Sequence, residues 1–225
     1  MKKTIGLIVV LIIMLVTLTG CAEINYEVEV HNDGSGNITY IYGISKEKMG
    51  NSTDIVEQFV ETMREQAEES GYTINTYEDE DISGFKANKY IENLSEDFSL
   101  EEAFGAEYVK DTEDNKIKIE KSFWTTKYSQ NTEIDLTNLS DEDVEMTYKI
   151  KLPTKVKTSN ANNTSEDGKQ LTWTLTGGEK NKIEFTAEEI NMLPIAIILL
   201  VIIVVAIGIT VFIILKKKHV TKTEK

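Results

Sequence analysis

Apolar and polar residues alternate over residues 24–44, on both sides of a short polar segment. The alternation has a period of two, which is typical of β-strands that bury one face. The segment between them, "NDGSGN", holds Asp33, Gly34 and Gly36, residue types that favour turns with positive φ. The pattern therefore predicts a β-hairpin. Its apolar positions are Ile24, Tyr26, Val28, Val30, Ile38, Tyr40, Tyr42 and Ile44.

The period changes between residues 53 and 70, where apolar residues recur at intervals of three and four. This spacing places them on one face of an α-helix. Asn51 or Ser52 is suited to cap the first turn, and Gly71 follows the last turn. We predict an amphipathic helix over 53–70. Its apolar face consists of Ile55, Val56, Phe59, Val60, Met63 and Ala67.

More alternating segments follow this helix. They predict strands over 72–77, 85–91, 117–123 and 144–152, and a last hairpin that joins 171–175 to 183–187 through the Gly-rich turn "TGGEKN". A short helix is predicted around Leu100 to Phe104. With many strands and few helices, the fold class is predicted to be α+β. We expect an antiparallel, curved sheet packed on the 53–70 helix in a helix-grip-like arrangement.

The N-terminus has the layout of a secretory signal, with two lysines followed by an apolar run over 5–18. The run ends in a sequence with the form of a bacterial lipobox, Leu18-Thr19-Gly20-Cys21. In a lipobox the cysteine thiolate takes a diacylglycerol before the signal is removed. We expect 1–20 to be a lipoprotein signal peptide and Cys21 to carry the lipid, including palmitate. The alternatives are an uncleaved signal anchor, or ordinary cleavage beside an incidental cysteine.

The other end holds a second apolar segment. Residues 192–215 form a run of 24 residues without a charge, which as a helix would span roughly 36 Å, more than the hydrocarbon core of a bilayer. The tail, 216–225, contains five lysines and one acidic residue. The positive-inside rule places this tail in the cytoplasm and residues 21–190 outside the cell membrane. Both tethers are short, so we expect a domain held close to the bilayer and oriented by its two anchors.

The net charge is −14, and all but one of the 38 acidic residues lie between Cys21 and Asn191. Such a surface repels the phosphates of nucleic acids, which excludes nucleic-acid binding. It also disfavours simple electrostatic docking on anionic lipid. Cys21 is the only cysteine, so disulfides are not expected to stabilise the domain. About 170 residues are enough to form one hydrophobic core, and we expect a single domain over 21–190.

Residues suited to catalysis are scarce in this domain. His31 is its one histidine, and the chain has no "GxSxG", HExxH, P-loop or Cys/His cluster. The acidic runs "YEDEDIS" and "SDEDVE" lack the ligand spacing of a calcium loop and are interpreted as solvated turns. We expect a protein without enzymatic activity, metal or cofactor apart from the lipid on Cys21. An envelope hydrolase with paired carboxylates stays open as a less favoured alternative.

At the opening of the domain, a lipobox is followed at once by a strand, an x-D-G-x-G turn and a second strand that runs into "YGISKEKM". This opening resembles the LppM-like lipoprotein domain family. The later "GYT", "LTWTL" and C-terminal membrane helix followed by lysines are similar in pattern. The residue-by-residue matches are Asp33, Gly34, Gly36, Tyr42 and Gly43. The resemblance implies a membrane-tethered extracytoplasmic α+β domain, shaped like helix-grip lipid carriers, that binds envelope lipids or glycolipids.

A ligand groove between sheet and helix would be lined by Tyr40, Tyr42, Phe59 and Met63. The same tyrosines would equally cover a half-buried sheet face, with their hydroxyls reaching water. Our functional hypothesis is a membrane-anchored lipoprotein that binds an envelope lipid or glycolipid close to the bilayer surface. The alternative is a non-enzymatic scaffold for another membrane protein.

Overall fold

Eleven strands and three helices are found among the residues that the computed structural model describes, which are 22–46, 71–78, 80–104, 108–109, 115–139 and 144–223. The chain divides into two compact units. The first consists of Met1–Glu120 with Lys127–Glu188, and the second of Lys121–Thr126 with Glu189–Lys225. The predicted 53–70 helix and the lipobox lie outside the described residues.

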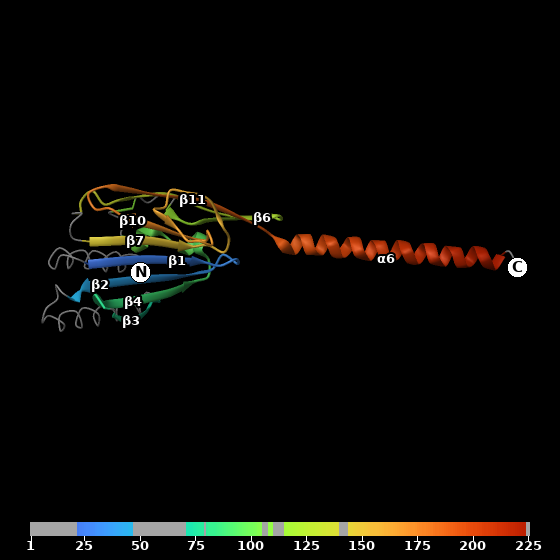
Figure 1. Ribbon diagram of the computed structural model, residues 1–225, viewed down its shortest axis with the longest axis horizontal. Helices are drawn as coiled ribbons and strands as arrows, with labels where there is room; N and C mark the ends of the chain where they lie inside the picture. The colour runs from blue at the N-terminus through green and yellow to red at the C-terminus, as the bar shows by residue number, and fades with distance from the viewer. Residues whose placement is uncertain are drawn as a thin grey trace. The chain divides into compact units, whose positions relative to one another are not determined.

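The larger sheet contains seven strands, and those labelled β3, β4, β2, β1, β7 and β10 lie side by side in Figure 1. Burial alternates with the predicted period of two over 26–30 and 170–175. In spatial order the strands are β3 (Thr73–Glu78), β4 (Ile82–Ile91), β2 (Gly36–Ser45), β1 (Ala22–Val30), β7 (Val144–Lys151), β10 (Gln170–Leu175) and β9 (Asn163–Thr164).

A second sheet of four strands faces the β7–β10 part of the first. Its order is β5 (Lys118–Lys121), β6 (Thr125–Asp135), β11 (Lys180–Ile190) and β8 (Val156–Ser159). A buried hydrogen bond between Tyr148 and Gln130 and a ring contact between Trp173 and Phe185 join the two sheets. The hydrophobic core therefore lies between two β-layers.

The predicted α+β class is confirmed, but one pairing differs from an all-antiparallel sheet. Strands β1 and β7 run parallel, with Tyr26 opposite Tyr148. A parallel pair requires a long connection, and here the chain passes through β2 to β6 before it returns as β7. The alternation of apolar residues is the same in either direction, so the sequence pattern did not reveal this direction.

Two further predictions need correction. The expected hairpin over 171–175 and 183–187 is a corner instead, because β10 joins the larger sheet and β11 the smaller one. The strand expected over 117–123 ends earlier: β5 stops at Lys121, and a turn leads into the unpredicted strand β6. Phe123 lies in that turn with its side chain exposed.

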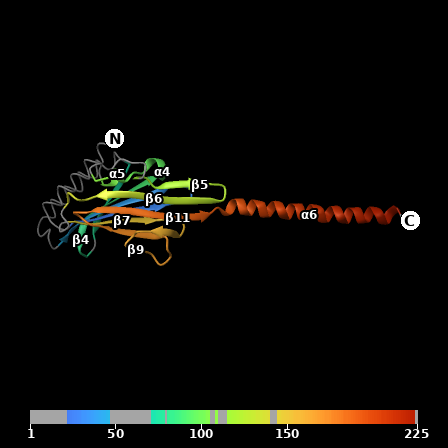
Figure 2. The ribbon, with the colours of Figure 1, turned by 90° about the horizontal axis from the view of Figure 1, so that it is seen from above.

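Two short helices, α4 (Leu94–Asp97) and the predicted α5 (Leu100–Phe104), lie close together in Figure 2. Both contribute to the core: Phe98, the C-cap residue of α4, and Phe104 of α5 contact the ring of Tyr26 on β1. Leu94 packs over Gly36 of β2 so closely that a Cβ at Gly36 would collide with it and with the Glu29 carbonyl oxygen. Gly36 is therefore required for close packing, whereas the turn conformation with positive φ is adopted by Gly34, at 91°.

The second unit contains α6 (Met192–Thr223). The segment Met192–Val211 is 20 residues long, apolar and nowhere buried, so it is long and apolar enough to cross a membrane.

Candidate functional site

A row of aromatic side chains crosses the inner face of the larger sheet. Tyr40 on β2 is the register partner of Tyr26 on β1, Tyr26 that of Tyr148 on β7, and Tyr148 that of Trp173 on β10. Successive ring centroids are 6.1, 6.1 and 5.5 Å apart. Aromatic cross-strand pairs at these distances stabilise a sheet beyond the area they bury. We call Tyr40, Tyr26, Tyr148 and Trp173 the aromatic row.

The row continues at both ends. Phe85 on β4 stacks on Tyr40 and Tyr42, with centroids 6.1 and 5.6 Å away. At the other end, Phe185 of the smaller sheet lies 6.2 Å from Trp173. The two predicted groove tyrosines on β2 are thus brought to this row, Tyr42 buried and Tyr40 partly buried. The other two predicted groove residues, Phe59 and Met63, lie outside the described residues, as do Leu18, Thr19, Gly20 and Cys21.

Burial changes the acid–base behaviour of the tyrosines. It raises the pKa of Tyr42 to about 12 and raises the pKa values of Tyr40 and Tyr148 well above the ordinary value. These phenols therefore stay neutral at physiological pH. They can donate and accept hydrogen bonds but carry no charge.

The inner face of β6 is unusually polar for a strand that faces a core. Tyr128, Gln130 and Thr132 are all buried there, at alternate positions. The Thr132 hydroxyl donates a hydrogen bond of 2.8 Å to Asn115 Oδ1, which is also buried. Polar groups in a core cost free energy unless each finds a partner. Among the described residues, this face therefore places several polar side chains in the interior between the sheets.

Gln130 connects this polar face to the aromatic row. The Tyr148 hydroxyl donates a hydrogen bond of 3.0 Å to Gln130 Oε1, and Gln130 is only 2% exposed. Among the described residues, Gln130 Nε2 has no hydrogen-bond partner. A buried donor left unsatisfied costs about 1–3 kcal/mol. The amide is thus a donor available to an acceptor between the sheets, and sequence patterns did not single it out.

The outer face of the larger sheet holds a polar depression of about 260 Å³. Its charged groups pair with each other across β1 and β7: Lys149 lies 3.1 Å from Glu27, and Lys151 lies 2.8 Å from Glu29. Because these charges are already paired within the sheet, they have little capacity to attract a charged ligand. The side chains and backbone that line the depression belong to Glu27, Val28, Glu29, Asn37, Thr39, Lys149, Lys151 and Gln170.

The first hairpin brings together a histidine, a serine and an aspartate. Ser35 Oγ donates to Asp33 Oδ1 at 2.6 Å, and His31 Nδ1 lies 3.0 Å from Ser35 Oγ. Because the single serine proton points to the carboxylate, His31 Nδ1 must be the donor to Ser35. Asn37 Nδ2 then donates to His31 Nε2, at 3.3 Å. In a Ser-His-Asp triad the histidine accepts the serine proton. Here His31 donates to Ser35 instead, so the three residues form a network that stabilises the turn.

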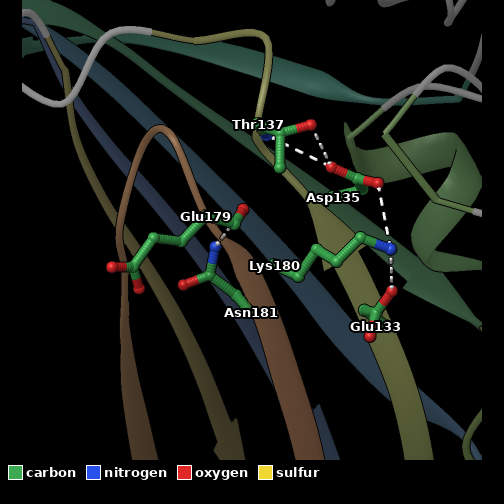
Figure 3. Close-up of polar contacts among 6 residues, drawn as sticks. All are labelled: Glu133, Asp135, Thr137, Glu179, Lys180 and Asn181. Carbon is green, nitrogen blue, oxygen red and sulfur yellow. Dashed lines mark hydrogen bonds and ion pairs between the residues drawn. The ribbon is translucent and has the colours of Figure 1, made fainter.

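The corner between β10 and β11 is fastened to the end of β6 (Figure 3). Lys180 lies 2.8 Å from Glu133 and 3.3 Å from Asp135, and Asp135 Oδ1 accepts a 2.6 Å bond from the Thr137 hydroxyl. The Thr137 bonds, followed by Lys180, lower the pKa of Asp135. Asn181 donates to the Thr176 and Glu179 carbonyls. These contacts hold the β10–β11 corner against the end of β6.

Groups of three or more carboxylate, histidine or cysteine side chains arranged for a metal ion do not occur among the residues that the structure describes. The acidic run at 78–81 includes Glu78, which pairs with Lys46 at 2.9 Å. Carboxylates such as Glu27, Glu78 and Asp135 thus participate in ion pairs and turns. The candidate site is the aromatic row with the inner face of β6.

Three comparisons with known proteins were made. The search of solved structures matched the NMR structure of the folded domain of LppM from Mycobacterium tuberculosis, at 14% identity and a TM-score of 0.49, covering 77% of this chain and 92% of that one. The search of curated proteins found no match. A model of the LppM domain matches residues 23–189. Since this match covers most of the sequence, the chain belongs to the LppM domain family.

Proposed function

We propose that this protein is a membrane-anchored lipoprotein whose extracytoplasmic domain binds an envelope lipid or glycolipid close to the bilayer surface. The observation that carries the proposal is the junction of Gln130 and Tyr148. There a buried amide donor without a partner among the described residues meets a row of aromatic rings. Ligand sites commonly combine an apolar or aromatic lining with a few polar groups that fix orientation. A lipid or glycolipid offers both an apolar chain and oxygen acceptors.

In this proposal the aromatic row contacts the apolar part of the ligand, and Gln130 Nε2 donates to a carbonyl or hydroxyl oxygen. Beside Tyr40 of the row, Tyr42 extends the lining on β2, together with Phe59 and Met63 as expected from the sequence. The tyrosines stay neutral, so recognition does not depend on a charged phenol. Neutral recognition suits a strongly acidic chain, which would repel an anionic head group at long range.

The anchors proposed are a diacylglycerol on Cys21 and α6 as a single membrane span, with the lysine-rich tail in the cytoplasm. Mass spectrometry of the full-length protein from a bacterial membrane tests the first anchor. The N-terminal peptide should begin at Cys21 and carry diacylglycerol, and the Cys21→Ser variant should keep its signal peptide. An unmodified thiol at Cys21 in the wild-type protein would contradict this anchor.

Photoactivatable lipids test the binding site. The full-length protein is reconstituted with a lipid extract that contains them, irradiated and mapped by peptide mass spectrometry. We expect crosslinks in β6 and β7, which should be lost in the double variant Gln130→Met/Tyr148→Phe. Gln170→Met, on the outer face of the sheet, is the matched control and should keep them. Crosslinks confined to α6 would reject the site and favour the alternative, a scaffold for another membrane protein.

A further inference from the structure

The turn between β5 and β6 presents two large aromatic side chains to solvent. Phe123 is 64% exposed and Trp124 is 51% exposed. Their rings touch edge to face, with centroids 4.8 Å apart and planes at 89°. Two adjacent exposed aromatics form an apolar surface that has no partner among the described residues, and such surfaces commonly mark contact sites.

The turn holds these rings outward by short polar contacts. The Ser122 backbone N–H donates to the Thr125 carbonyl at 2.8 Å, and the Ser122 hydroxyl reaches the same carbonyl, also at 2.8 Å. The Thr125 backbone N–H donates back to Ser122 Oγ at 3.0 Å. The turn is thus closed on itself, and Phe123 and Trp124 are held at its tip. We call these two residues the aromatic tip.

Asn191 fastens the turn to the start of α6, which belongs to the same compact unit. Its backbone N–H donates to the Trp124 carbonyl and its Nδ2 to the Ser122 carbonyl, both at 2.8 Å. Its Oδ1 accepts from the Thr126 hydroxyl at 3.0 Å. Asn191 directly precedes Met192, the first residue of the apolar segment. Figure 2 shows the turn beside the beginning of α6.

We propose that Phe123 and Trp124 insert into the interfacial layer of the bilayer, beside the point where α6 enters it. A helix that crosses a membrane places its first apolar residue at the boundary between head groups and hydrocarbon, and Asn191 holds the aromatic tip at that level. Tryptophan and other amphipathic rings favour this layer. Exposed Lys121 and Lys127 flank the tip in sequence, and lysines near a membrane boundary extend their ammonium groups to the head groups.

The inference rests on α6 crossing the membrane, as in the proposed function, but not on a lipid between the sheets. Trp124 and Trp173 are the two tryptophans of the chain. Trp173 is buried, at 3% exposed, and donates to Asn160. Fluorescence therefore distinguishes the tip from the core within one protein: lipids brominated on their acyl chains quench a tryptophan that touches the bilayer and spare one inside the domain.

The test uses the full-length protein in vesicles made with lipids brominated either near the head group or near the chain end. Flotation with the vesicles first establishes that α6 is inserted, which separates failure of the membrane anchor from failure of the tip. We expect stronger quenching by the bromines near the head group. Quenching should be lost in Trp124→Phe, whose remaining Trp173 emission also reports that the domain is folded. In Asn191→Ala, which loses two of the three bonds, quenching should weaken.

Equal quenching of the wild-type protein and Trp124→Phe would overturn the proposal, as would the absence of quenching in floated protein. Quenching that is strongest near the chain ends would also overturn it, because the ring would then lie in the hydrocarbon and not in the interfacial layer.

Discussion

The hydroxyl of Tyr148 on β7 donates a hydrogen bond to Gln130 Oε1 on β6, across the space between the two sheets. Both residues are buried: the exposed fraction is 0% for Tyr148 and 2% for Gln130. The bond is a polar bridge in a core whose other members are mostly apolar, and it directs the amide nitrogen of Gln130 to a position without a partner among the described residues. The same pair of residues therefore contributes to the stability of the domain and to the proposed binding site.

Removing one member of this pair should destabilise the domain. Tyr148→Phe leaves the oxygen of Gln130 without its donor, at a cost of about 1–3 kcal/mol in the free energy of unfolding. Replacing both residues, as in Gln130→Met/Tyr148→Phe, should restore most of this loss, because no buried polar group is left unpaired. Denaturant unfolding followed by near-UV circular dichroism measures both. A double variant less stable than Tyr148→Phe alone would show that the pair has a different role.

Strand β6 explains why sequence patterns found most of the fold but not this pair. The hairpin of β1 and β2, strand β7 and helix α5 were predicted because apolar residues alternate or cluster there. In β6 the inward positions include Thr126, Tyr128, Gln130 and Thr132. Polar residues therefore stand on both faces, and the period-two contrast disappears. The one available signal was the strand-favouring threonine and tyrosine.

The corner at β10–β11 was missed for a different reason. A tight Gly-rich turn joins the two strands, as in a hairpin, with Gly178 at φ 72°. Which sheet each strand enters depends on partners far away in sequence: β10 pairs with β7, and β11 lies between β6 and β8. Local turn chemistry carries no information about such partners, just as it did not indicate the parallel pairing of β1 with β7.

Gly36 should tolerate no side chain. In Gly36→Ala the added methyl would meet the Glu29 carbonyl and Leu94, and overpacking of this kind costs about 1–3 kcal/mol. Adding Leu94→Ala would remove the side-chain collision but not the carbonyl contact, and the truncation of this fully buried leucine leaves a cavity with its own cost, so the double variant should stay below the wild type. Gly208→Ala is the control, because a methyl there meets nothing within 4 Å. The measurement is the melting temperature of the wild type, of Gly36→Ala with and without Leu94→Ala, and of Gly208→Ala, all in one detergent. An unchanged value for Gly36→Ala would contradict the close packing at this position.

Low pH should remove the stabilising contribution of Asp135 at the β10–β11 corner. Its pKa is lowered by the hydroxyl and backbone bonds from Thr137 and then by Lys180. A carboxyl with a lowered folded pKa stabilises the fold above its unfolded pKa, near 3.8, and that contribution is lost as the pH falls through the folded value. We expect the melting temperature of Asp135→Asn to vary less with pH below about 5 than that of the wild type. Thr137→Val should have the same effect in a weaker form, and identical pH profiles for all three proteins would rule the contribution out.

Titration to alkaline pH should detect the buried phenol of Tyr42. Desolvation raises its pKa to about 12, above the unfolded value of about 10. Burial of the neutral phenol therefore contributes stability that is present below about 10 and is lost as the pH rises through the folded value. In an absorbance titration of tyrosinate, Tyr42→Phe should remove part of the late step. A late step unchanged in Tyr42→Phe would mean that the ring is open to hydroxide in the folded protein.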